Sequence, residues 1–293
     1  MIVSMLLAFS VMPAQAGIHA ESPALHRVSM DPSLRWGDGG GHSPPRELKV
    51  CADPNNLPFS NSKLEGFENK LVALVARDLG ARVTYTWWAQ RRGNVRNTLN
   101  AGLCDLIPGV GSSVDMLLTT RPYYRSTYVA VTRADRNLGD ITGFDDPRLA
   151  TLKIGVQLIG DDGANTPPAD ALAKRGITAN VRGFMVYGDY DSAAPQADIL
   201  KAVATGEVDV AFVWGPVAGY FAPRQPAPLK VTPLAERFDG PQLPLAFDIS
   251  MGTRRADRAL RDEVEGALER HKAEMKALLA AYGVPLVEDD TAP

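Results

Sequence analysis

Three short apolar segments of the sequence are each accompanied by side chains that could bind a small molecule. Carboxylate, amide and aromatic groups follow residues 48–52, at Asp53, Asn55, Asn56, Phe59 and Asn61. Indole, amide and guanidinium groups end or follow residues 83–88, at Trp87, Trp88, Gln90 and Arg91. Small residues that allow close approach to the backbone end or follow residues 105–110, at Gly109, Gly111 and Ser112. These groups form hydrogen bonds, stack and carry charge, so the chemistry they indicate is binding.

Sequence patterns typical of enzymes are missing. The four histidines lie away from these three segments, at His19, His26, His42 and His271. There is no G-x-S-x-G nucleophile elbow and no glycine-rich phosphate loop. The stretch at residues 189–191, Asp-Tyr-Asp, lacks the glycine and the terminal glutamate of a calcium-binding loop. We therefore expect no catalytic residue, no metal site and no bound cofactor, although acid–base chemistry by Asp53 and Asp189 alone stays open.

The composition excludes two further classes of function. The net charge of the 293 residues is −3 and no run of Lys or Arg occurs, which argues against a nucleic-acid partner. No stretch of about 18 apolar residues occurs, so we expect no membrane span. A chain of this length is long for one core and comfortable for two modest lobes.

Hydrophobic periodicity predicts strands alternating with helices. The predicted strands are residues 48–52, 83–88, 105–110, 153–158, 179–187 and 208–214. The predicted helices are residues 67–79, a short one near residues 95–99, then 168–175, 194–205 and a long one over 256–282. This alternation is typical of a layered α/β protein with a parallel sheet. In such sheets ligands bind at the carboxyl ends of the strands, where the groups described above lie.

One short pattern, which we call the internal echo, occurs twice in the sequence. Gly102-Leu103-Cys104-Asp105 and Gly206-Glu207-Val208-Asp209 each place a glycine after a predicted helix and an aspartate before a predicted buried strand. Two lobes of similar topology would produce this pattern, although a glycine after a helix is common by itself.

The first 45 residues differ from the rest. Residues 2–12 are mostly apolar and Ala14-Gln15-Ala16 matches a signal-peptidase pattern, although no Lys or Arg precedes them. Residues 17–45 are rich in Gly, Pro, Ser and His, so we expect them to be disordered. Parts of this segment also look like translated intergenic repeat DNA. We expect export to the periplasm and exclude residues 1–45 from the fold.

Several strings in the remaining chain are long enough to carry a family resemblance. They are CADPNNLPFSN at 51–61, GFENK at 66–70, YTWWAQRRG at 85–93 and TTRPYYRSTY at 119–128. The order of the motifs resembles the type II extracellular solute-binding proteins. The strings resemble, more narrowly, the quinoprotein-dehydrogenase-associated J-type members of methanol-oxidation clusters (MoxJ and XoxJ).

The resemblance implies a two-lobed α/β fold of the type II periplasmic binding proteins. Lobe one would comprise residues 46–131 and 245–293, and lobe two residues 132–244, with two hinge crossings near 128–133 and 245–252. The first strand and the strand after Gly102-x-x-Asp105 would then be neighbours, so we expect a Cys51–Cys104 disulfide over two free thiols. Further cleft residues would be Arg121, Tyr123, Tyr124, Arg125, Asp161, Asp162, Tyr187, Asp189, Tyr190, Trp214 and Phe247.

Each of these candidates has a plainer structural interpretation. Phe59, Trp88 and Tyr124 are typical packing residues, and the Asn55-Asn56 pair is typical of a turn. The arginines at 91, 92, 121 and 125 could form salt bridges, and Asp161-Asp162-Gly163 could cap a helix.

Two departures from amino-acid-binding relatives bear on function. Those proteins clamp the substrate carboxylate with an arginine where this sequence has Ser113, and they hold the ammonium with an acid where it has Trp214-Gly215. The resemblance therefore implies a monomeric, non-enzymatic accessory or maturation partner of a PQQ-dependent methanol (alcohol) dehydrogenase that could bind a small ligand in its cleft. The alternative is the binding component of an ABC importer for a small molecule other than an amino acid.

Overall fold

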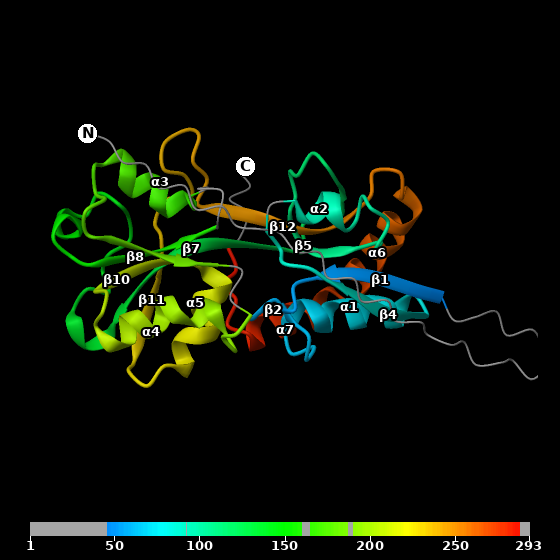
Figure 1. Ribbon diagram of the computed structural model, residues 1–293, viewed down its shortest axis with the longest axis horizontal. Helices are drawn as coiled ribbons and strands as arrows, with labels where there is room; N and C mark the ends of the chain where they lie inside the picture. Colours follow the sequence, from blue (N-terminus) through cyan, green and yellow to red (C-terminus); the bar gives the residue numbers. More distant parts are fainter. Residues whose placement is uncertain (1–45, 92, 160–164, 187–189, 288–293) are drawn as a thin grey trace, which may run out of the picture. The chain divides into compact units, whose positions relative to one another are not determined.

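The computed structural model describes residues 46–91, 93–159, 165–186 and 190–287 (Figure 1). The signal-like segment 1–45 lies outside the described residues, as do the predicted cleft residues Asp161, Asp162, Tyr187 and Asp189.

The strands form one large sheet and two small ones. β1 (Arg46–Ala52) pairs in parallel with β4 (Ala81–Trp87), and β2 (Asn55–Asn56) pairs with β3 (Ser60–Asn61). The large sheet has the order β5-β12-β7-β10-β8-β9, with β11 beside β7 and β6 beside β12. Its strands are β5 (Ile107–Gly111), β6 (Leu118–Thr119), β7 (Tyr124–Arg133), β8 (Ile154–Leu158), β9 (Val181–Met185), β10 (Val210–Trp214), β11 (Leu229–Pro233) and β12 (Ala246–Thr253).

Helices cover the strands. α1 packs against β4, while Figure 1 shows α3 on one side of β8 and β10 and α4 and α5 on the other. The α-helices are α1 (Phe67–Asp78), α2 (Asn94–Asn97), α3 (Pro167–Lys174), α4 (Asp198–Thr205), α5 (Gly215–Phe221), α6 (Arg258–Arg270) and α7 (Lys272–Ala281). Short 3-10 turns are η1 (Ala134–Arg136), η2 (Pro147–Ala150), η3 (Pro195–Ala197) and η4 (Ala222–Arg224).

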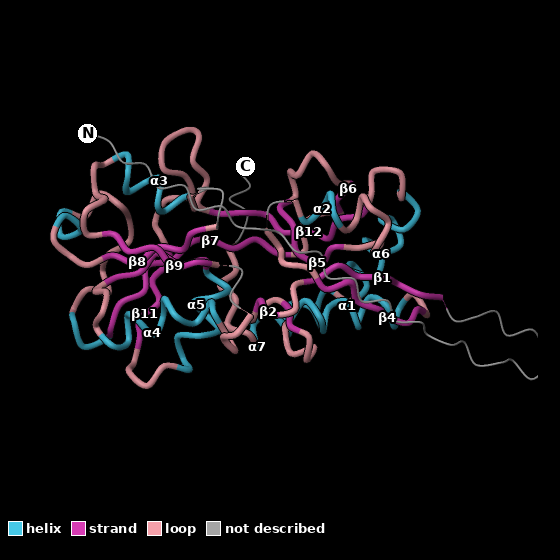
Figure 2. The backbone as a smooth tube through the Cα atoms, in the orientation of Figure 1, coloured by secondary structure: helices cyan, strands magenta, loops and turns pink. Residues whose placement is uncertain are grey.

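The expectation of a parallel sheet is wrong for the middle of the large sheet. β7 runs antiparallel to β10, β11 and β12, whereas the described strand pairs β10–β8, β8–β9 and β1–β4 are parallel. Figure 2 shows β7 and β12 side by side. β7 pairs with β12 through Tyr124–Thr127 and with β10 through Tyr128–Thr132, so it changes partners at Tyr128. This long strand has no alternating pattern, because eight of its ten residues are buried and the other two are half-buried.

The internal echo reflects two equivalent turns. Gly102 and Gly206 both have a positive φ, 75° and 77°, which favours glycine. Gly206 is the C-cap of α4, whereas Gly102 lies in the turns after α2, which ends at Asn97. After each turn an aspartate N–H donates to a lysine carbonyl: Asp105 to Lys49 and Asp209 to Lys153, both at 2.8 Å. In both places the following strand lies parallel to its predecessor, as the Val50–Leu106 bridge and the β8–β10 pair show.

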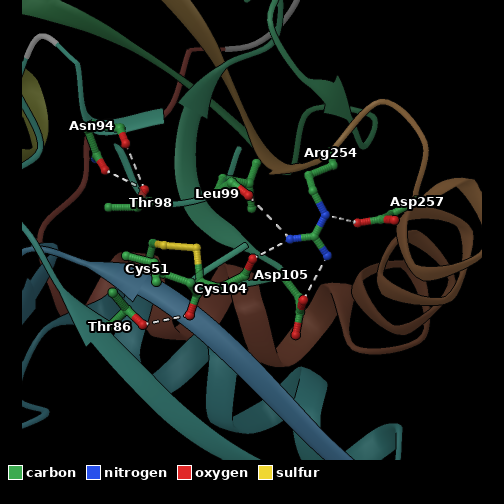
Figure 3. The surroundings of a disulfide bond; sticks show 10 residues. Cys51, Thr86, Asn94, Thr98, Leu99, Cys104, Asp105, Arg254 and Asp257 are labelled. Atoms are coloured by element: carbon green, nitrogen blue, oxygen red, sulfur yellow. Dashed lines mark hydrogen bonds and ion pairs between the residues drawn. A yellow bond between two sulfur atoms is a disulfide. The ribbon is translucent and has the colours of Figure 1, made fainter. Parts of the chain in front are cut away.

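The Cys51–Cys104 disulfide is present (Figure 3). β1 carries Cys51 and the turn after Gly102 carries Cys104, with a Cα–Cα distance of 5.5 Å. Both cysteines are buried. The guanidinium of Arg254 lies beside the bridge, donates to the carbonyl of Cys104 and pairs with Asp105 at 2.8 Å. The expected disulfide is thereby confirmed.

The long C-terminal helix expected over residues 256–282 is in fact two helices. α6 ends at Arg270 and α7 begins at Lys272, because His271 has φ −103° and ψ 18°, outside helical values. The His271 ring lies 2.8 Å from a Glu274 oxygen and 3.0 Å from an Asp78 oxygen at the end of α1. The bend allows α6 and α7 both to contact α1.

The same contacts predict an acid-sensitive junction. Hydrogen bonds from Arg270 and His271 lower the pKa of Asp78 to about 2 from an ordinary value of 3.8. A lowered pKa contributes stability above the ordinary value, and that contribution is lost as the pH falls toward 2. We therefore expect the urea midpoint of the wild type to fall more steeply between pH 5 and pH 2 than that of Asp78→Asn. The exposed Asp115→Asn variant should follow the wild type, and equal slopes for all three would contradict this assignment.

Candidate functional site

A cavity of about 470 Å³ lies where predicted site residues converge. Its wall includes residues from all three predicted lobe segments, 46–131, 132–244 and 245–293. Nine residues selected from the sequence line it: Asn56, Phe59, Gln90, Arg91, Gly109, Gly111, Tyr124, Trp214 and Phe247. Sequence reasoning missed Glu68, Val110, Tyr128, Gln157, Ile159, Thr166, Pro167, Val186, Gln196, Val217 and Ile249.

Four side-chain amides cross one wall of the cavity in a head-to-tail chain. Gln90 donates to the Gly109 carbonyl at 2.6 Å, and Asn56 donates to Gln90 Oε1 at 3.3 Å. Gln196 donates to Asn56 Oδ1, and Gln157 donates to Gln196 Oε1 at 3.1 Å. The Trp214 N–H then donates to Gln157 Oε1 at 2.8 Å. This amide chain joins residues 56, 90 and 109 to residues 157, 196 and 214.

Local structure positions each amide. Asn56 sits in the β2–β3 hairpin, Gln157 in β8 and Gln196 in η3. Gln90 follows β4, and its backbone N–H donates to Asp53 at 2.9 Å. No periodic pattern marks the two glutamines of the second half, so only the fold brings them to Asn56 and Gln90.

Asp53 supports the cavity wall from behind. It is 1% exposed, does not line the cavity and accepts hydrogen bonds from the N–H groups of Asn55 and Gln90, both at 2.9 Å. Burial raises the pKa of Asp53, although these bonds and the charge of Arg91 act in the opposite direction. Its contacts hold the loops that carry Asn56 and Gln90.

Glu68 is an acid in the cavity wall. It is the second residue of α1, is 3% exposed, and burial raises its pKa to about 8, with Asp53 acting in the same direction. A Cβ atom at position 109 would lie 1.9 Å from Glu68 Oε1, so only glycine leaves space for this carboxyl. One sequence signal could have found it: Glu68 shares a helix face with the buried Leu71, Val72 and Val75.

Aromatic rings form another part of the wall. The centroids of Tyr128, Trp214 and Phe247 lie 5.3 to 6.4 Å apart, all in edge-to-face contact. Tyr124 lines the cavity from the start of β7, and Phe59 lines it from the loop between β2 and β3. These rings leave apolar surface next to the amide chain and Glu68.

The structure places nine other predicted residues off the cavity wall. Two of them are Ser112, whose hydroxyl lies 2.6 Å from that of Ser250, and Tyr190, which is 48% exposed. Trp87 stacks on Tyr85 with centroids 4.6 Å apart, and Trp88 is 41% exposed. Arg121 and Arg125 form ion pairs with Glu265 and Asp248, which is the alternative that the sequence left open. The amide of Asn55 donates to the Ser192 carbonyl at 2.7 Å, and that of Asn61 to Glu65 at 2.7 Å. The hydroxyl of Tyr123 donates to the Pro108 carbonyl at 3.0 Å.

The described residues lack two kinds of feature. Within residues 46–287, apart from the undescribed gaps, no group of three or more His, Cys, Asp or Glu side chains is arranged to hold a metal ion. Over the same residues, no helix is long and apolar enough to span a membrane.

Comparison with known proteins decides the family. The model of the bacterial extracellular solute-binding proteins, family 3, matches residues 48–284. This chain belongs to that family. Among curated relatives of this family 3 protein, MoxJ of Methylorubrum extorquens is 32% identical over 82% of the chain and 81% of the relative. MoxJ of Paracoccus denitrificans is 30% identical over 82% of the chain and 89% of the relative.

Solved structures agree with this assignment. The periplasmic binding protein XoxJ of Methylobacterium extorquens is 34% identical to this chain, and the two structures superpose with a TM-score of 0.67. The match covers 83% of this chain and all of XoxJ. MxaJ of Methylophaga aminisulfidivorans is 26% identical, with a TM-score of 0.71 over 82% of this chain and all of MxaJ. The expected type II α/β fold and the expected resemblance to J-type proteins are both confirmed.

Proposed function

We propose that the protein is a periplasmic binding protein that serves as an accessory or maturation partner of a PQQ-dependent methanol (alcohol) dehydrogenase. The observation that carries the proposal is the match to MoxJ, MxaJ and XoxJ over more than four fifths of the chain. The strings at 51–61, 66–70, 85–93 and 119–128 that resemble J-type proteins lie around the cavity and at the start of β7. The proposed role is non-enzymatic.

The cavity itself supports an accessory role over amino-acid import. Ser113, where amino-acid-binding relatives carry an arginine, is exposed and does not line the cavity. Trp214 lines the cavity where those relatives carry an acid. A zwitterionic amino acid would therefore find neither charged anchor at the two positions that these relatives use. Import of another small molecule through an ABC system is the less supported alternative.

We propose two interaction regions, and two lobes formed by residues 46–131 with 245–293 and by residues 132–244. The cavity would hold a small ligand through the amide chain and the aromatic wall, and the exposed edge around Trp87 and Trp88 would contact the dehydrogenase. The change of β7 partners at Tyr128 supports a boundary near residue 131.

A pull-down with the full chain from periplasmic extract tests this function. Bound proteins are identified by mass spectrometry, and small molecules are identified after denaturation of the complex. Recovery of a quinoprotein dehydrogenase supports the accessory role. Recovery of a stoichiometric metabolite with no dehydrogenase overturns that role and favours transport.

One exposed tryptophan offers a sharper test of the partner surface. We expect Trp88→Ala to weaken dehydrogenase binding about tenfold, because an exposed indole that becomes buried at an interface is a typical hot spot. The fold should be unaffected, since 41% of the residue is exposed. Met185→Ala removes an equally exposed side chain, 47%, and should leave the affinity unchanged. Equal dissociation constants for wild type and Trp88→Ala in titration calorimetry would exclude Trp88 from the interface.

A further inference from the structure

Two buried oxygen-bearing side chains in the cavity wall have no hydrogen-bond partner among the described residues. They are the Glu68 carboxyl and the Tyr124 hydroxyl, on residues that are 3% and 6% exposed. The desolvation of a polar group is costly when no partner replaces water. Nearby polar groups in the amide chain and at Asp53 are satisfied by protein contacts, so Glu68 and Tyr124 differ from their surroundings.

Glu68 is an acidic residue of this wall that forms no ion pair with any described residue. Asp53 faces it and raises its pKa, and the tyrosines at 85, 123 and 124 are close enough for Glu68 to raise theirs. The positive charge of Arg91 acts on Asp53, whose pKa it lowers, and on Tyr190. Arg91 also lines the cavity, but burial and Asp53, not Arg91, determine the pKa of Glu68, so the wall next to Glu68 has acidic and aromatic character.

We infer that the cavity takes a compact organic cation of the ammonium class, with Glu68 as its anionic anchor and the aromatic rings around it. This inference rests on the proposed role of the cavity as a ligand site. An ammonium group is attracted to the faces of Trp and Tyr rings, and a carboxylate supplies the opposite charge. Such a ligand would meet Glu68 and Tyr124 on one side and the Tyr128, Trp214 and Phe247 rings on the other.

Binding is coupled to loss of a proton from Glu68. With a pKa of about 8, most of the carboxyl is protonated at pH 7 in the absence of a cation. The proton passes to solvent when the cation binds, so charge is conserved in the cavity. Because Glu68 occupies the first turn of α1, the helix N-terminus also favours the ionised form.

The test uses the purified full chain and permanently charged probes, whose own charge does not change with pH. The probes are tetramethylammonium, choline and benzyltrimethylammonium, and 3,3-dimethylbutan-1-ol is the uncharged isostere of choline. We expect at least one cation to bind in calorimetry, and choline to bind more tightly than its isostere. The affinity should rise about tenfold from pH 6 to pH 7 and level off above about pH 8.5. At pH 7 the binding heat should also vary with the ionisation enthalpy of the buffer, as release of nearly one proton requires.

Two variants assign the effect to Glu68. Glu68→Gln keeps the shape of the protonated side chain, so the fold should persist while the pH dependence and the proton release disappear. Glu47→Gln removes an acid that pairs with Arg82 at the surface and should behave as wild type. Absence of binding by every cation up to 10 mM overturns the inference, as does equal affinity for choline and its isostere. Capture of a dehydrogenase in the pull-down would be unaffected by either failure, so the two proposals fail separately.

Discussion

Replacement of both Cys51 and Cys104 by alanine should lower the free energy of unfolding by about 4 kcal/mol. The bridge closes a loop with a sequence separation of 53 residues, and a loop of this length restricts the unfolded chain strongly. The bridge also connects β1 to the turn that precedes β5. Its loss removes a covalent restraint on the end of β1, which Asp53 follows. Urea unfolding under oxidising conditions measures the difference.

Reduction provides the matched control for this prediction. A reducing agent should destabilise the wild type by a similar amount. It should leave the double variant unchanged, because the sequence has two cysteines and the variant has lost both. A wild type and a double variant with the same unfolding midpoint would show that the bridge contributes nothing to stability.

The second large effect should come from Phe67. Its ring is fully buried and contacts Phe59, Tyr124 and Tyr282, with centroids 5.4, 6.0 and 5.8 Å away. Phe67→Ala would leave a cavity among rings that belong to three separate parts of the chain, so we expect a loss of about 3–5 kcal/mol. Because Phe59 and Tyr124 also line the ligand cavity, the variant should lose ligand affinity as well.

A matched control uses another phenylalanine. Phe238 is 50% exposed, so Phe238→Ala should change the free energy of unfolding by no more than about 0.5 kcal/mol. A Phe67→Ala variant as stable as Phe238→Ala would contradict the role of this ring as a centre of the core.

Local sequence signals predicted the elements whose partners are close in the chain. The apolar face of residues 67–79 predicted α1, since side chains three and four residues apart share a helix face. The glycine at 206 predicted the end of α4, whose C-cap it forms with a positive φ. The same expectation for Gly102 is wrong, because α2 ends at Asn97 and Gly102 lies in the turns that follow. These signals depend on the backbone of a few neighbouring residues, so tertiary contacts alter them little.

Strand orientation and helix continuity followed from distant contacts instead. The alternation of strands and helices suggested a parallel sheet, yet β12 returns from the C-terminal part of the chain to lie antiparallel to β5 and β7. An uninterrupted apolar stripe suggested one helix over residues 256–282. The structure divides this segment into α6 and α7 at His271, whose ring contacts Asp78, 193 residues away in the sequence.

The candidate site shows the same division. Asn56, Gln90, Arg91 and Trp214 were found because each ends or follows a predicted strand, where open α/β sheets bind ligands. Asp161, Tyr187 and Asp189 lie outside the described residues, and their ligand role stays a prediction. Gln157 and Gln196 carry no local pattern, and they became visible through their hydrogen bonds with Asn56 and Trp214.

By itself, the sequence determined the family, the α/β class, the cysteine pair and nine of the twenty residues that line the cavity. It did so because these depend on residue strings, periodicity and strand ends, which are properties of short segments. The tertiary structure alone decided that Glu68 faces the cavity and that four amides join its two sides. Burial and hydrogen bonding between residues up to 140 positions apart depend on how the whole chain packs, and no short segment encodes them.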